Sequence, residues 1–201
     1  GKFQQAVNVV KQALTVALPQ QVPGLLKVLG RGFRKLGDYH QALDCFNQAL
    51  ASIKSSSSSF TSPSVFSSST MTKQGKKNGH QQNPSSLSLQ QEEKALKTES
   101  TSKYFQKMDF DIASCLDEKA DALRKLDRNS EALSILKEAL AMKQASLPAR
   151  HPAIADTLYS IAAAEKASGN PLKAFNLVSE GISIIQNFYG PESKRLFDLK
   201  F

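Results

Sequence analysis

The feature that most constrains the fold is a layout of apolar residues that occurs three times along the chain. In residues 23–51 apolar side chains recur at intervals of three and four, which is the spacing of one helix face. A break at Gly37 divides this series into two helices joined by a tight turn. The two helical stripes consist of Leu26, Leu29, Phe33 and Leu36, and of Ala42, Phe46, Ala49 and Leu50. The same layout returns at residues 116–123 with 132–139 and at 158–162 with 174–181, and a half unit stands at 1–13. Such repetition predicts an all-α chain, an α-solenoid of helix hairpins.

A Ser-rich stretch separates the first hairpin from the other two. Residues 52–102 hold sixteen Ser, with a run at 55–59, and few large apolar side chains. Such a segment buries too little apolar surface to offset its conformational entropy, so we predict a long disordered insertion over 54–102. A short helix over 89–96 would be marginal alone.

The insertion divides the chain into three parts. Residues 1–53 are predicted to form a half repeat and one full repeat, and 103–201 two 42-residue units followed by the start of a further helix. The Ser-rich segment is either a linker between two helical modules or an extrusion from one array.

The turns carry recognisable helix-end residues. Gly37 is predicted to end its helix in a left-handed conformation. In the last unit, Gly169, Asn170 and Pro171 supply a C-terminal cap, an N-cap and a first-turn proline in sequence.

The first hairpin resembles the tetratricopeptide repeat. Its spacing is L-x2-LG-x2-F-x8-A-x3-F-x2-A, from residue 26 to 49. Small residues at Gly30, Ala42 and Ala49 would let the two helices approach, and large residues would fill the gaps between them. The pattern departs at Leu26, where Trp is common, and at Lys54, where Pro usually ends the repeat.

The C-terminal units resemble a subtype, the repeats of kinesin light chains. The segment RHPAIADTL at 150–158 is similar to the HP-x-VA-x-x-L stretch of that family, and YGPE at 189–192 to its G-P-[DE] turn. Tyr159 and Ser160 stand where that pattern often has two Asn.

Motifs for catalysis or cofactor binding are not found in the sequence. It holds no phosphate-binding glycine loop and no four-ligand zinc pattern, so we expect no enzyme, no cofactor and no metal. Cys45 and Cys115 are interpreted as small buried hydrophobes, and Gly30 as a close-packing residue. His151 precedes a proline at a helix start, which favours a local hydrogen-bonding role.

Net charge leaves several partner classes open. The formal charge is +8, and the N-terminal half and the middle carry most of the excess. A basic surface favours acidic peptides, anionic lipid or nucleic acid. No apolar run approaches the roughly 18 residues of a membrane span, and two cysteines indicate a reducing compartment, cytoplasmic or nuclear.

The family resemblance implies a binding groove lined by the first helix of each unit. The residues that it places there are Lys27, Arg31 and Arg34 with Lys35 at their edge, then Asp117, Asp121 and Arg124, then Tyr159, Ala163 and Lys166. Such a groove would be basic at one end and mixed at the other, and would suit a protein or peptide ligand with an acidic segment. The alternative is that the cations only form a solvated helix face.

Three hypotheses on function follow. The first is a non-catalytic scaffold that binds a partner peptide or helix in the groove. The second is the helical, non-catalytic region of a larger enzyme, since the last unit is somewhat similar to the C-terminal region of SET- and MYND-domain lysine methyltransferases. The third is nucleic-acid binding through the basic N-terminal half. Ser62, followed by Pro63, is a candidate phosphorylation site, and an unregulated spacer is its alternative.

Overall fold

The computed structural model describes residues 1–58 and 84–191, with side chains described for 1–55 and 99–191. Within these ranges the regular structure is helical throughout, as the repeats predicted. The helices are α1 (Lys2–Thr15), α2 (Val22–Leu36), α3 (Tyr39–Ser58), α4 (Pro84–Lys125), α5 (Asn129–Ser146), α6 (Pro152–Ala167) and α7 (Pro171–Tyr189). The predicted candidate site Ser62 and the further helix after 191 lie outside the described residues.

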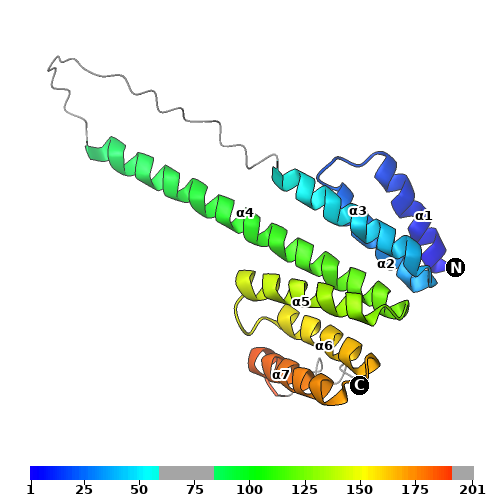
Figure 1. Ribbon diagram of the computed structural model, residues 1–201. Coiled ribbons are helices and arrows are strands. Elements are labelled where there is room, and N and C mark those ends of the chain that lie inside the picture. Colours follow the sequence, from blue (N-terminus) through cyan, green and yellow to red (C-terminus); the bar gives the residue numbers. More distant parts are fainter. Residues whose placement is uncertain (59–83, 192–201) are drawn as a thin grey trace, which may run out of the picture.

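The helices stack in chain order as hairpins, α2 with α3, the second half of α4 with α5, and α6 with α7 (Figure 1). α3 also packs against α4, so the array continues across the Ser-rich segment. One apolar core runs from Val7 of α1 to Ala164 of α6 and includes Phe46 and Leu123, both at most 1% exposed. The described helices on either side of the Ser-rich segment therefore share one core.

The predicted boundaries of the insertion differ from the helix ends. α3 extends to Ser58, and α4 begins at Pro84, so both ends of the 54–102 segment are helical. The reason is that residues 89–96 are rich in strong helix formers and adjoin a packed helix, which supplies the costly nucleus. Disorder stays a prediction for residues 59–83.

Three equivalent turns close the hairpins. Each has one residue with positive φ, namely Gly37 at 84°, Asp127 at 58° and Gly169 at 82°. The next residue's amide donates to the carbonyl five positions earlier, for example Asp38 to Phe33 at 3.0 Å. The left-handed caps predicted at Gly37 and Gly169 are confirmed.

Asn170 occupies the N-cap position of α7 but does not cap that helix with its side chain. Its Nδ2 instead donates to Glu165 Oε2 at 2.8 Å, and its backbone amide donates to the Glu165 carbonyl at 2.9 Å. The side chain therefore secures the turn to α6. The predicted first-turn proline, Pro171, is observed.

Small residues set the distance between neighbouring helices. A Cβ on Gly30 would lie 2.7 Å from the Phe46 ring, and one on Gly32 would lie 2.7 Å from Val7 Cγ2. Gly30 therefore lets α2 and α3 pack closely, as the sequence predicted.

No helix in the described parts of the chain has the length and apolar character that crossing a membrane needs.

Candidate functional site: the concave face of the first helices

The first helices of the three hairpins, α2, α4 and α6, lie side by side, since α4 contacts both others. Between them is an open hollow of about 400 Å³. Its lining side chains come from these three helices and from α5: Arg34, Phe110, Ser114, Asp117, Glu118, Asp121, Lys143, Ala153, Asp156 and Ser160. We call this surface the concave groove.

The two groove arginines predicted on α2 are paired with carboxylates of α4. Arg31 Nε donates to Glu118 Oε1 at 2.7 Å. Arg34 lies 2.9 Å from Glu118 Oε2 and donates from Nη1 to Asp121 Oδ2 at 2.5 Å. Each of the two guanidinium groups therefore has a carboxylate partner on α4, and the Arg31 side chain is still 47% exposed.

Lys27 has a looser ion pair. Its Nζ lies 3.6 Å from Asp111 Oδ1, beyond good hydrogen-bond length, and its side chain is only 15% exposed. It lies outside the concave groove, in a second pocket at the N-terminal end of α2.

The structure brings Asp117 together with two residues that the sequence analysis missed. Lys143 of α5, 3% exposed, pairs with Asp117 and donates to Thr157 Oγ1 at 2.7 Å. The Thr157 hydroxyl lies 3.2 Å from both Asp117 carboxylate oxygens. Burial raises the pKa of Asp117, and the Lys143 ammonium and these hydrogen bonds act in the opposite direction.

Lys143 could have been found from the repeat pattern. It continues the buried stripe of α5 at helical spacing after Ala132, Leu136 and Ala139. A lysine on such a stripe requires a buried carboxylate partner, and Asp117 was already a candidate. Glu118 gave no comparable signal, because its partners are 87 and 84 residues away.

The remaining predicted groove residues lie elsewhere. Arg124 donates from Nη2 to Asp121 Oδ1 at 2.6 Å, one turn away on α4. Lys35 and Lys166 are exposed in the last turns of α2 and α6 and do not line the hollow.

Tyr159 faces α7, not the groove. Its ring lies 3.1 Å from the position that a Cβ on Gly181 would take, so the small residue makes room for it. Burial raises the pKa of Tyr159. The α6 side chains in the groove are instead those of Asp156 and Ser160, one turn apart. The prediction chose Tyr159 and Lys166 because they occupy positions equivalent to those of the first unit, and neither residue lines the hollow.

Carboxylates outnumber cations among the side chains that line the groove. Four carboxylates line it, those of Asp117, Glu118, Asp121 and Asp156, against the two cations Arg34 and Lys143. Each cation already contacts a groove carboxylate. Arg31 and Arg124, which do not line the hollow, also pair with Glu118 and Asp121.

Two other sequence interpretations are confirmed. His151 caps α6, because its Nδ1 accepts from the amide of Ala153 at 3.1 Å. Cys45 and Cys115 are buried free thiols, and burial raises the pKa of Cys115 to about 11. Across residues 1–55 and 99–191, no group of three or more His, Cys, Asp or Glu is placed to hold a metal ion.

Residues 25–57 match one model of the tetratricopeptide repeat, and residues 112–153 match another. These two segments coincide with the α2–α3 and α4–α5 hairpins. The chain carries tetratricopeptide repeats. This confirms the family that the first hairpin predicted, and the stacked hairpins are the fold expected of it.

Solved structures extend the comparison to nearly the whole chain. BtubC (BKLC) from P. vanneervenii matches with a TM-score of 0.58 at 14% identity, over 98% of this chain and 60% of that one. This likeness shows the shared helical-repeat fold. The chain thus spans 60% of the length of BtubC.

Two further structures match at lower TM-scores. Nearly identical TPR-like repeats named for a kinesin light chain of Podospora anserina match at 0.38, with 16% identity, over 94% of this chain and 90% of that one. The TPR2AB domain of yeast Sti1 in complex with pHSP90 matches at 0.35, with 15% identity, over 99% and 78%. No curated protein matches the sequence.

Proposed function

We propose that the protein is a non-catalytic scaffold that binds a partner peptide with a basic segment in the concave groove. The observation that carries this proposal is the set of four carboxylates that line a hollow shared by three successive first helices. Tetratricopeptide repeats support a role in protein interaction, and the structure of the Sti1 repeats with pHSP90 is an example of such a complex.

The lining chemistry favours a lysine- or arginine-containing ligand over an acidic one. Asp117, Glu118 and Asp121 already satisfy the groove's own cations, so a ligand carboxylate would meet like charge. A cationic side chain would be attracted by these carboxylates, and its methylene stem or charged head would lie on the Phe110 ring. The same carboxylates disfavour the phosphates of nucleic acid on this face.

The acidic ligand predicted from Lys27, Arg31 and Arg34 therefore finds no support in the concave groove. The buried free thiols suit a reducing compartment, and we place the scaffold in the cytoplasm or nucleus.

A matched pair of variants tests the groove. Ser160→Arg would put a bulky cation into it, whereas Ser179→Arg would put the same side chain on the exposed surface of α7. Both serines donate only to the carbonyl four residues earlier, Asp156 at 3.2 Å and Phe175 at 3.0 Å, so both substitutions remove the same kind of hydrogen bond.

Peptides selected from a random library on the wild type would be measured against both variants at two salt concentrations. We expect enrichment of basic segments, affinity at least about tenfold weaker for Ser160→Arg, and little change for Ser179→Arg. Raising the salt should weaken binding, because the attraction is screened. Selection of acidic peptides, or equal affinity for both variants, would contradict the proposal.

A further inference from the structure

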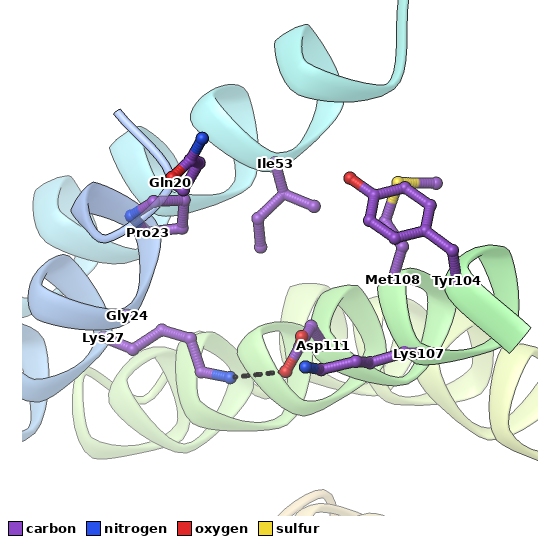
Figure 2. Close-up of a pocket in the computed structure, with 9 residues that line it drawn as sticks. All are labelled: Gln20, Pro23, Gly24, Lys27, Ile53, Tyr104, Lys107, Met108 and Asp111. Carbon is purple, nitrogen blue, oxygen red and sulfur yellow. Dashed lines mark ion pairs between the residues drawn. The ribbon is translucent and has the colours of Figure 1, made fainter. Parts of the chain in front are cut away.

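A second hollow, of about 420 Å³, lies beside the concave groove at the start of α2. The first turn of α2 forms one wall, Ile53 near the end of α3 another, and α4 forms the floor (Figure 2). Pro23, Tyr104 and Met108 complete an apolar interior. We call this the edge pocket.

Gly24 lines the edge pocket and adds no side chain to it. It lies in the first turn of α2, and glycine in a helix costs roughly 0.5–1 kcal/mol relative to alanine. The other glycines of α2 have a packing reason, since a Cβ on Gly30 or Gly32 would clash with a neighbouring side chain. A Cβ on Gly24 would meet nothing within 4 Å, and Gly24 does not have positive φ. Neither close packing nor turn geometry therefore requires a glycine here.

The rim of the edge pocket has a net positive charge. Lys27 and Lys107 line it with a single carboxylate, Asp111 (Figure 2). Lys27 forms only the 3.6 Å ion pair with Asp111, too long for a good hydrogen bond, so its ammonium keeps donors for a further acceptor. Lys107 has no ion pair with any residue that the structure describes, so the rim can take a second carboxylate.

We propose that the edge pocket holds a large apolar side chain of a partner peptide, such as Leu, Met or Phe, with a neighbouring carboxylate of that peptide on Lys27 and Lys107. Charge complementarity selects this occupant, because the rim has one carboxylate for two lysines. The inference rests on the proposed scaffold function only in that the partner is a peptide. Its ligand has the opposite charge from that of the concave groove, so the two sites can be tested apart.

The test uses the full chain and the same random peptide library. Among peptides selected on the wild type, we expect a class with an apolar residue next to Asp or Glu. Gly24→Leu should weaken that class at least about tenfold by filling the pocket, whereas Gly24→Ala should leave its affinity nearly unchanged. Ser160→Arg, in the concave groove, should also leave this class unchanged.

A charge exchange keeps the test decisive if Gly24→Leu perturbs the fold. Lys107→Glu should weaken the same peptides, and replacing their acidic residue by Lys should restore binding to that variant. Absence of an apolar–acidic class, or full affinity in folded Gly24→Leu, would overturn the proposal. A switch from dimer to monomer in Gly24→Leu, with peptide binding unaffected, would assign the pocket to a second copy and overturn it too. The scaffold function itself fails only if basic peptides are also absent.

Discussion

Arg34 of α2 donates a hydrogen bond to Asp121 of α4 at 2.5 Å, although 87 positions separate the two residues in sequence. The interval contains the whole Ser-rich segment. Arg34 also lies 2.9 Å from Glu118, and Arg31 donates to that carboxylate at 2.7 Å. This cluster joins the first hairpin to the second, on the same face that forms the concave groove.

Asp121→Asn should lower the free energy of unfolding by about 1 kcal/mol, because it removes the carboxylate from a partly buried pair and from Arg124. The matched control is Glu131→Gln, which breaks an exposed pair with Arg128 within one hairpin and should leave the melting temperature unchanged. Urea unfolding of both variants checks this. Equal effects would contradict a stabilising role for the interhelical cluster.

Lys143→Met should lower the free energy of unfolding by about 3–5 kcal/mol, since it leaves Asp117 partly buried without its cation. The double variant Lys143→Met/Asp117→Leu should recover much of this loss, because it removes the uncompensated charge. Thermal unfolding of four proteins, namely the wild type, Lys143→Met, Asp117→Leu and the double variant, measures the coupling. A double variant as unstable as the sum of the two single ones would show that the pair is not coupled.

The loss in Lys143→Met should depend on pH. Burial already raises the pKa of Asp117, and the variant lacks the group that chiefly opposes this shift. A folded-state pKa above the unfolded value means that the carboxyl favours folding most below the unfolded pKa, near 3.8, and that this stability falls as pH rises through the folded pKa. Unfolding at pH 5 and pH 8 should therefore show a smaller loss at pH 5. An equal loss at both would oppose this assignment.

The same substitution at two positions of α2 should have opposite signs. Gly30→Ala would place a Cβ 2.7 Å from the Phe46 ring and should cost about 1–3 kcal/mol through overpacking. Gly24→Ala meets open space and should stabilise the protein by up to about 1 kcal/mol through helix propensity. Melting temperatures of both variants test this difference, and a destabilised Gly24→Ala would show that Gly24 has a structural role.

Asp127→Gly should stabilise the protein by a few tenths of a kcal/mol to about 1 kcal/mol, because a glycine adopts positive φ without the steric cost of a Cβ. Asp127 has φ of 58° at the α4–α5 turn, where the equivalent turns have Gly37 and Gly169. Urea unfolding of the variant and the wild type measures the difference. An unchanged or lower unfolding midpoint would indicate that the aspartate side chain compensates for the strain.

Local patterns were enough to predict the hairpins. Apolar spacing located the helices, and Gly37 and Gly169 marked two of the turns, because these features depend on residues within a few positions. Asp127 gave a weaker signal at the third turn, since aspartate adopts positive φ less readily than glycine.

The charges of the groove could not be predicted in this way. Whether Arg34 is solvated or paired depends on the register of α2 against α4, which packing across the insertion determines. The side of α6 that faces the groove depends likewise on where Tyr159 fits, and it fits over Gly181. The pairing of Arg31 and Arg34 with carboxylates of α4 was therefore not predictable from the sequence.

The most direct test of the account is to map where a library-selected basic peptide binds by amide chemical shifts. We predict shifts concentrated on the first helices, at residues such as Ser114, Asp156 and Ser160, which line one hollow. Shifts confined to the outer surface of α7, where Leu172 and Phe175 are exposed, would contradict the concave groove as the binding site.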